Sequence, residues 1–203
     1  MNNVDLFVFD TRSLSLEKLI SKLGLSEEEL SAFDKYKAEE TKKEKLVSFY
    51  FKKRFAPDFY VDENGKPQSK SVYFNISHSK GMVVIALNKK HPLGVDIELI
   101  RPVEGSLIQY ISNDDEYQYI DSQEKFYEVW TSKESLMKCV GVGIKESPKN
   151  IPALPLNGVK HYSFSRYQSK IFKLDNFVIS LTLESEEEFS ILSPIKNHYL
   201  VIE

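Results

Sequence analysis

The sequence has 203 residues, of which 41% are hydrophobic and 28% charged, with a formal net charge of -3 at pH 7. This composition is typical of a folded globular protein and excludes a disordered chain, while the net charge argues against a dedicated nucleic-acid binder. A single cysteine, Cys139, excludes a disulfide within the chain. Because no basic region precedes an apolar core at the start and no apolar run exceeds MVVIAL, we expect neither leader nor membrane span, and a cytoplasmic location.

The first half of the chain predicts a mixture of helices and strands. Leucine and isoleucine recur at helical spacing before Gly24, Ser26 and Glu29 have the spacing of a capping box, and Pro57 ends a longer helix. Period-two and short apolar runs separated by polar turns indicate strands. The expected elements are a strand over 4–9, helices over 16–23, after 26 and over about 38–55, and strands over 72–76, 81–88 and 93–99, with turns at 62–67, 77–80 and 89–92.

The second half begins near residues 101–106 and predicts the same two kinds of element. A helical region is expected from Asn113 to Val140, ended by Gly141 and Gly143. Alternating segments at 160–168, 177–183 and 198–203 predict strands. Each half therefore contains helix and sheet, although no repeat is visible in the residues themselves.

Two carboxylates interrupt an apolar strand in the segment HPLGVDIELI. Side chains alternate between the faces of a strand, so Gly94, Asp96 and Glu98 share one face, with the Cα atoms of the two acids about 7 Å apart. The pattern suits an ordinary strand that exposes acids to water. It equally suits a site for a divalent cation, since two hard oxygen ligands lie on a rigid element with no Lys or Arg on that face.

Two further segments carry polar residues that have both structural and functional interpretations. Residues 126–144 predict an amphipathic helix in which Glu134 and Lys138, four residues apart, could form a surface ion pair of little consequence. The segment GKPQSKSVYFNISHS places Lys66 in a turn, and Ser77 and His78 in a polar turn after a strand. Each of these residues alone could be a satisfied turn residue.

Taken together, the order and spacing of the three segments resemble the 4'-phosphopantetheinyl transferases of the surfactin-synthetase-activating (Sfp) type. The resemblance is strong over residues 65–144 and general elsewhere. The family carries arginine in its long N-terminal helix, where this chain has lysines around Glu44. The matching segments are Gly65-Lys66-Pro67, Phe74-Asn75-Ile76-Ser77-His78-Ser79, Gly94-Val95-Asp96-Ile97-Glu98, and Trp130-Thr131-Ser132-Lys133-Glu134 followed by Lys138, Gly141 and Gly143.

The resemblance implies transfer of the phosphopantetheine arm of coenzyme A to a serine hydroxyl of an acyl or peptidyl carrier protein, with release of adenosine 3',5'-bisphosphate. It implies an α+β fold of two similar α/β lobes related by a pseudo-twofold, residues 1–101 and 102–203, with the active site in the cleft between them. Mg²⁺, or alternatively Mn²⁺, would be the cofactor, and a monomer without membrane or nucleic-acid partners is expected. The implied site residues are Asp96, Glu98 and Glu134 for the metal, Glu134 and Lys138 for catalysis, and Lys42, Lys45, Lys66, Ser77, His78 and Lys138 for coenzyme A.

The residue chemistry agrees with this activity, because attack of a hydroxyl on a diphosphate builds up negative charge that Mg²⁺ and lysine neutralise. Glu134 could be a metal ligand, the base that takes the serine proton, or both. The basic residues between Lys35 and Arg54 form either a solvated helix face or a surface that attracts acidic carriers or phosphate. Two other classes stay open, namely a different Mg²⁺-dependent phosphate-transferring or hydrolysing enzyme and a non-catalytic module that binds coenzyme A or a carrier. The sequence has no P-loop and no H-E-x-x-H motif.

Overall fold

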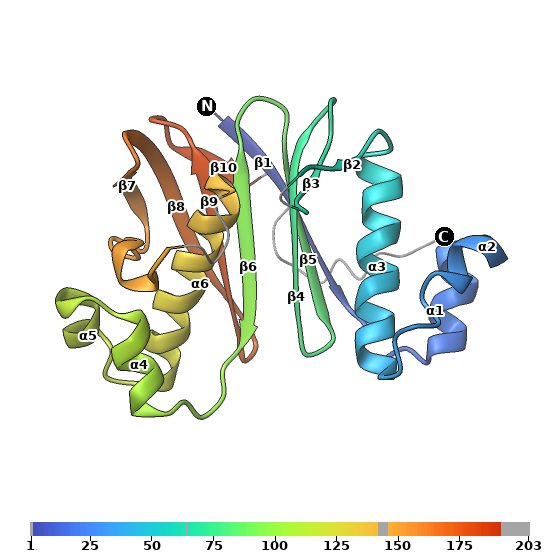
Figure 1. The fold of residues 1–203 in the computed structure, drawn as a ribbon, viewed down its shortest axis with the longest axis horizontal. Coiled ribbons are helices and arrows are strands. Elements are labelled where there is room, and N and C mark those ends of the chain that lie inside the picture. Colours follow the sequence, from blue (N-terminus) through green and yellow to red (C-terminus); the bar gives the residue numbers. More distant parts are fainter. Residues whose placement is uncertain (1, 64, 142–145, 192–203) are drawn as a thin grey trace.

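The computed structural model describes residues 2–63, 65–141 and 146–191. Two four-stranded sheets pack face to face, and a long helix covers the outer face of each (Figure 1). Apolar residues from the inner faces of both sheets form one shared core, in which Val84 of the first sheet and Val95 of the second are fully buried. The α+β class expected from the sequence is therefore confirmed.

The first sheet has the strand order β10-β1-β5-β4, in which the neighbours β1, β5 and β4 are antiparallel and the short β10 runs parallel to β1. The helices α1 and α3 pack on its outer face. The bounds are β1 (Asn2–Asp10), α1 (Leu16–Leu23), α2 (Glu27–Ser31), α3 (Glu39–Phe55), β4 (Tyr73–Ser79), β5 (Met82–Asn88) and β10 (Phe189–Ile191), with β2 (Tyr60–Val61) and β3 (Pro67–Gln68) forming a separate hairpin.

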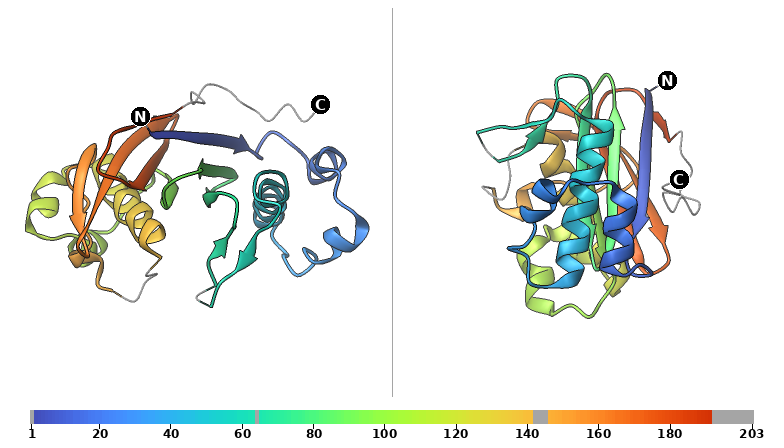
Figure 2. Two further views of the ribbon diagram at one scale, coloured as in Figure 1. Left: turned by 90° about the horizontal axis from the view of Figure 1, so that it is seen from above. Right: turned by 90° about the vertical axis from the view of Figure 1, so that its right-hand side faces the viewer.

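The second sheet has the antiparallel order β6-β9-β8-β7. Helix α6 lies along its outer face, and Figure 2 shows α3 and α6 on different sheets with the strands between them. The bounds are β6 (Leu93–Leu99), α4 (Gly105–Ile111), α5 (Asp114–Tyr119), α6 (Gln123–Val140), a 3₁₀ turn at Pro148–Asn150, β7 (Gly158–Tyr162), β8 (Ser165–Leu174) and β9 (Phe177–Glu184).

The two halves of the chain build their sheets in the same order. In the first half a strand, a long helix and two more strands follow one another as β1, α3, β4 and β5, and the sheet order is β1-β5-β4. In the second half β6, α6, β8 and β9 follow one another, and the sheet order is β6-β9-β8. The short β10 from the end of the chain joins the sheet of the first half, so the two halves are also interlocked.

Local signals in the sequence explain where most elements begin and end. The Ser26 and Glu29 capping box is present, and Gly24 and Gly141 close α1 and α6 with φ of 59° and 85°. These left-handed conformations strain any residue with a Cβ atom, which is why glycine stands at both helix ends. The Ser122 hydroxyl accepts a hydrogen bond from the Lys125 N–H and so marks the start of α6.

Several expected boundaries are wrong. Ser77, His78 and Ser79 belong to β4 and not to a turn, because they pair with β5 and the turn is made by Lys80 and Gly81, whose φ values are 47° and 80°. The helical region expected over residues 113–140 is divided into α5 and α6, and the segment 160–168 contains a hairpin turn between β7 and β8. Helix α4 and strand β10 were not expected, while Gly143 and the strand expected over 198–203 lie outside the described residues.

None of the helices in the described ranges combines the length and the apolar character that crossing a bilayer requires.

Strand β6 precedes the expected boundary at residue 101, yet it forms its hydrogen bonds with β9 in the second sheet. The polar face of β6 therefore lies beneath α6, and this arrangement builds the candidate site.

Candidate active site

Polar side chains connect β4 to β6 where the two sheets meet. The Asn75 Oδ1 atom accepts a hydrogen bond from the Val95 N–H at 3.0 Å, and the Ser77 hydroxyl donates to Asp96 at 2.8 Å. One step further along, the Ser79 hydroxyl donates to Glu98 at 2.7 Å. Because β4 is extended through Ser79, alternate residues of its polar segment face β6 and hold the two carboxylates in place.

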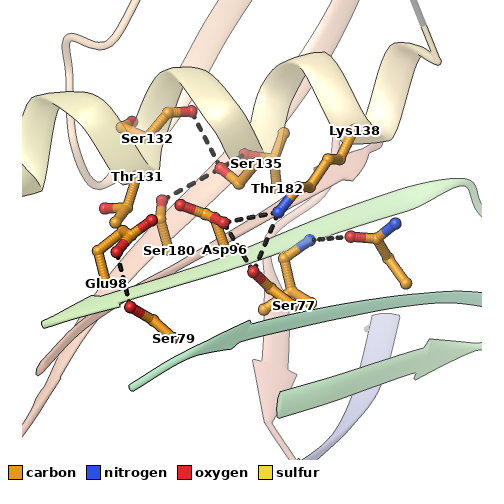
Figure 3. A network of polar contacts seen from close by, with 12 residues as sticks. Ser77, Ser79, Asp96, Glu98, Thr131, Ser132, Ser135, Lys138, Ser180 and Thr182 are labelled. Atoms are coloured by element: carbon orange, nitrogen blue, oxygen red, sulfur yellow. Dashed lines mark hydrogen bonds and ion pairs between the residues drawn. The ribbon is translucent and has the colours of Figure 1, made fainter. Parts of the chain in front are cut away.

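Asp96 lies at the centre of this group and is 4% exposed. Its Oδ1 atom accepts hydrogen bonds from Ser77 and from the Lys138 ammonium, the latter at 2.6 Å (Figure 3). Its Oδ2 atom is buried and has no hydrogen-bond partner among the described residues. A buried carboxylate oxygen without a partner is costly, so this atom has the capacity to bind one more ligand.

The glycine of the G-x-D-x-E motif lets α6 approach β6 closely enough to bring its side chains to Asp96. A Cβ atom on Gly94 would lie 2.0 Å from the Ser135 carbonyl oxygen and 2.4 Å from the Cys139 nitrogen. Below the helix, the Ser135 hydroxyl lies 2.8 Å from the Thr182 hydroxyl and 3.2 Å from the Ser180 hydroxyl of β9 (Figure 3). These small residues fix the distance between helix and sheet.

The acidic residues of the site influence one another through their charges. Burial raises the pKa of Glu98, and the neighbouring charge of Asp96 raises it further. The pKa of Glu134 is likewise raised by burial first and then by the charges of Asp96 and Glu98, while Lys138 opposes the shift. The structure thus brings together Asp96, Glu98, Glu134 and Lys138, and the ammonium group only partly offsets the negative charge.

The carboxylates are near each other without forming a closed ligand cluster. Within residues 2–63, 65–141 and 146–191, no three acidic, histidine or cysteine side chains converge closely enough to hold a metal ion. The chemistry of the donors nevertheless suits a hard cation, because all three are oxygen ligands, two have raised pKa values and Asp96 Oδ2 has no partner in the ranges just given.

A small pocket lies on the other side of β4, between this strand and α3. Its volume is about 250 Å³, and His78, Lys45 and Lys52 contribute positive or polar groups to it. The Lys45 ammonium lies 3.0 Å from His78 Nε2. Burial, followed by the charge of Lys45, lowers the pKa of Lys52. The other lining residues are Phe33, Tyr36, Ser48, Phe49, Pro67, Phe74, Asn75 and Ile76.

The residues predicted to bind coenzyme A therefore fall into separate places. Ser77 and Lys138 lie among the carboxylates, whereas His78 and Lys45 lie in the pocket. Lys66 donates a hydrogen bond to the Lys138 carbonyl oxygen at 2.7 Å and so lies at the end of α6. Lys42 instead forms an ion pair with Asp34 at 2.9 Å and does not line the pocket.

Sequence reasoning missed several residues that shape these places. Asn75 and Ser79 alternate with Ser77 along β4, so a predicted strand that continued to Ser79 would have placed all three on the side that faces β6. Lys133 of the W-x-x-K-E motif is fully buried and forms an ion pair with Glu116 at 2.7 Å. It also donates to the carbonyl oxygens of Pro148 and Ile151, so it ties α6 to its surroundings and does not face the site.

A larger and more open hollow of about 900 Å³ lies around the β7–β8 turn, where Phe164 is fully exposed. None of the residues that the sequence predicted for metal, catalysis or coenzyme A lines it. Size alone therefore does not identify the site, and the convergence of charged groups on β6 and α6 is the stronger observation.

Comparison with known proteins identifies a family that the part of the chain carrying these charged residues matches. Residues 92–190 match the family model described as the 4'-phosphopantetheinyl transferase superfamily. The resemblance seen in the motifs is thus confirmed over these residues, which make up just under half of the chain. The matched residues include Asp96, Glu98, Glu134 and Lys138, whereas the pocket between α3 and β4 lies outside them.

Individual relatives are of the Sfp type. The chain is 37% identical over 93 residues to the 4'-phosphopantetheinyl transferase gsp of Aneurinibacillus migulanus and 38% identical over 95 residues to psf-1 of Bacillus pumilus. It is 33% identical over 95 residues to Sfp of Bacillus subtilis strain 168. These matches cover 42% of this chain and 39%, 40% and 42% of the three relatives, so the chain spans well under half of each relative.

Proposed function

We propose that the protein transfers the 4'-phosphopantetheine moiety of coenzyme A to a serine hydroxyl of an acyl or peptidyl carrier protein. The observation that carries this proposal is the convergence of Asp96 and Glu98 from β6 with Glu134 and Lys138 from α6, within the stretch that matches the superfamily. The relatives named above bear the name of this activity, and its assignment to the whole chain is our proposal.

In the proposed reaction the serine oxygen attacks the phosphorus atom next to the pantetheine arm. The bond from that phosphorus to the bridging oxygen breaks, and adenosine 3',5'-bisphosphate leaves with the added negative charge. Lys138 would neutralise part of this charge, since its ammonium already lies within 2.6 Å of Asp96 and 3.0 Å of Ser77. Glu134, whose pKa is raised in the ion-free protein, would accept the serine proton directly or through water, provided that it reaches the metal ion only through water.

We infer that Asp96, Glu98 and Glu134 hold Mg²⁺, or Mn²⁺, between them. The support is the Oδ2 atom of Asp96, which has no hydrogen-bond partner in the described part of the chain, and the excess negative charge of the group. Since the three side chains do not form a closed cluster, Glu98 and Glu134 would have to reorient on binding. The ion would supply positive charge for the diphosphate oxygens. Ser77 and Ser79 hold the two β6 carboxylates in place throughout.

The nucleotide end of coenzyme A would occupy the pocket between α3 and β4. His78, Lys45 and Lys52 offer positive charge or hydrogen bonds for a phosphate, and the aromatic side chains offer stacking surfaces. Lys66, at the end of α6, would contact the molecule between the pocket and the carboxylates. Lys42 pairs with Asp34, so its predicted contact would require that ion pair to open.

We also propose that the two halves are pseudo-twofold related lobes with the reaction between them. The identical order of strand, helix, strand and strand in each half supports this relation. The boundary near residue 101, the monomeric state, the cytoplasmic location and the lack of nucleic-acid and membrane partners stay predictions.

The experiment that tests the function is incubation with coenzyme A, Mg²⁺ and a panel of apo carrier proteins, followed by intact-mass measurement of each carrier. We expect one carrier to gain the mass of one phosphopantetheine, with one adenosine 3',5'-bisphosphate released per modified carrier. Hydrolysis of coenzyme A without modified carrier would support another phosphate-transferring enzyme. Binding of coenzyme A without either change would support a non-catalytic module.

A further inference from the structure

Glu44 is a buried acid in a helix whose other charged residues are mostly basic. It is 5% exposed and lies in α3 beside Lys45. Its Oε2 atom lies 3.0 Å from His78 Nδ1, and its Oε1 atom accepts a hydrogen bond from the Gly81 N–H at 2.7 Å. Although burial raises the pKa of Glu44, the hydrogen bonds from His78 and Gly81 outweigh it and lower the pKa. Glu44 is therefore ionised beside the imidazole ring.

The contacts on both sides of the His78 ring define which nitrogen carries the proton. A lysine ammonium has only donors, so the 3.0 Å contact between Lys45 Nζ and His78 Nε2 requires a lone pair on Nε2. The proton of the neutral ring must then be on Nδ1, where it is donated to Glu44. Without a bound anion, the Lys45 ammonium also occupies the Nε2 lone pair to which a second proton would bind.

We propose that Glu44 is a positioning residue that couples anion binding in the pocket to proton uptake by His78. A phosphate monoester entering the pocket would draw the Lys45 ammonium to itself. His78 Nε2 would then take a proton from solvent and donate it in a hydrogen bond to a phosphate oxygen. The Glu44 carboxylate on the opposite side of the ring would stabilise the resulting imidazolium ion.

The charges around the ring favour this coupling. Helix α3 presents Glu44 on one side of His78 and Lys45 and Lys52 on the pocket side, and Tyr36 is the other titratable side chain that lines the pocket. No carboxylate among the described residues lines the pocket, so a bound phosphate would be the main negative charge on that side. Charge-assisted hydrogen bonds on both ring nitrogens are stronger than neutral ones.

That the phosphate belongs to coenzyme A rests on the proposed function, but the coupling itself is a property of the pocket. Adenosine 3',5'-bisphosphate is a suitable probe at about pH 8, where phosphate monoesters are already doubly ionised and take up no proton themselves. Calorimetry in two buffers of different ionisation enthalpy counts the protons taken up on binding. Nitrogen NMR of the ring reports the tautomer without any ligand.

Four proteins give a matched comparison, namely wild type, Glu44→Gln, Glu39→Gln and His78→Gln. Glu44→Gln keeps the size of the side chain and one oxygen that can accept the proton of the His78 ring, but it removes the negative charge and the acceptor for the Gly81 N–H. Glu39 pairs with Lys43 in the same helix and has no contact with His78, which makes it the control. Thermal unfolding verifies that each variant is folded. An exposed acid such as Glu39, whose side chain is 61% exposed, should be replaced without consequence.

We expect the Nδ1–H tautomer in wild type and uptake of up to about one proton per bound probe, since one imidazole titrates. Glu44→Gln should reduce the uptake and raise the Kd by about tenfold, the equivalent of one charge-assisted hydrogen bond at the low end of its range. His78→Gln should abolish the uptake, and Glu39→Gln should behave as wild type.

Three results would overturn the proposal: an Nε2–H tautomer in the free protein, unchanged uptake in Glu44→Gln, or uptake that persists in His78→Gln and so belongs to a buried lysine. Failure of the probe to bind would overturn it as well. Normal proton-coupled binding together with no transfer to any carrier would instead overturn the proposed function and leave the role of Glu44 standing.

Discussion

Replacing Gly94 by alanine should damage the site by separating the helix from the strand that carries its acids. The added Cβ atom would meet the Ser135 carbonyl oxygen at 2.0 Å, the Cys139 nitrogen at 2.4 Å and the Lys138 carbonyl carbon at 3.0 Å. All three are backbone atoms of α6, so no flexible side chain can move aside. Overpacking in a core costs about 1–3 kcal/mol, and these distances place Gly94→Ala at the upper end, about 3 kcal/mol.

Activity should fall along with stability. To relieve the contact, α6 must move outward, and it carries Glu134 and Lys138 away from Asp96. A displacement of about 1 Å in a positioned group can reduce the rate about 100-fold. Urea unfolding followed by circular dichroism gives the change in the free energy of unfolding, and mass measurement of a modified carrier gives the rate.

Gly105→Ala is the matched control. A Cβ atom at Gly105, in the first turn of α4, would have no neighbour within 4 Å. This replacement should be neutral or should stabilise the protein by up to about 1 kcal/mol. If Gly94→Ala proved as stable and as active as Gly105→Ala, the close approach of α6 to β6 would not position the site, and the reasoning would be refuted.

Other replacements separate the roles within the site and the core. Ser77→Ala removes one of two hydrogen bonds that hold Asp96 Oδ1, so kcat should fall about tenfold with little change in the KM for coenzyme A, and an unchanged kcat would count against the contact. Lys66→Ala should chiefly raise the KM for coenzyme A, and an unaltered KM would remove its predicted contact with that molecule. Lys160 is buried against Ser132, and burial followed by the charge of Lys133 lowers its pKa to about 7. Because the charged form is penalised in the folded state, the free energy of unfolding should increase as pH rises from about 7 towards the ordinary lysine value of 10.5, by at most about 1.4 kcal/mol per pH unit. Lys160→Met should flatten this dependence, and an unchanged slope in urea unfolding would contradict the assignment.

Much of the fold could be predicted because its signals are local. The capping box at Ser26, the αL glycines and the apolar strands are encoded within a few residues, and each appears in the structure. The end of β4 differs from the prediction because the polar residues Ser77 to Ser79 are typical of a turn but lie in the strand. The hydroxyl groups of Ser77 and Ser79 donate instead to Asp96 and Glu98 of β6, each 19 residues further along the chain.

The site shows the same division between local and distant information. The alternation of β6 correctly placed Asp96 and Glu98 on one face, and both acids lie beneath α6 and beside β4. Ser77 and His78 lie on opposite sides of β4 because the strand continues through both residues, paired with β5. This pairing could not be predicted from the local sequence. The buried ion pair of Lys133 with Glu116 depends on the packing of α5, which was not distinguished from α6.

The most direct test of the central claim compares wild type with Asp96→Asn by the intact mass of an apo carrier protein after incubation with coenzyme A and Mg²⁺. The replacement keeps the size of the side chain and removes the charge that pairs with Lys138 at 2.6 Å. We predict that wild type adds one phosphopantetheine per carrier and that Asp96→Asn, although folded, adds essentially none. Equal modification by both proteins would contradict the claim that the acids of β6 and the charged residues of α6 form the active site.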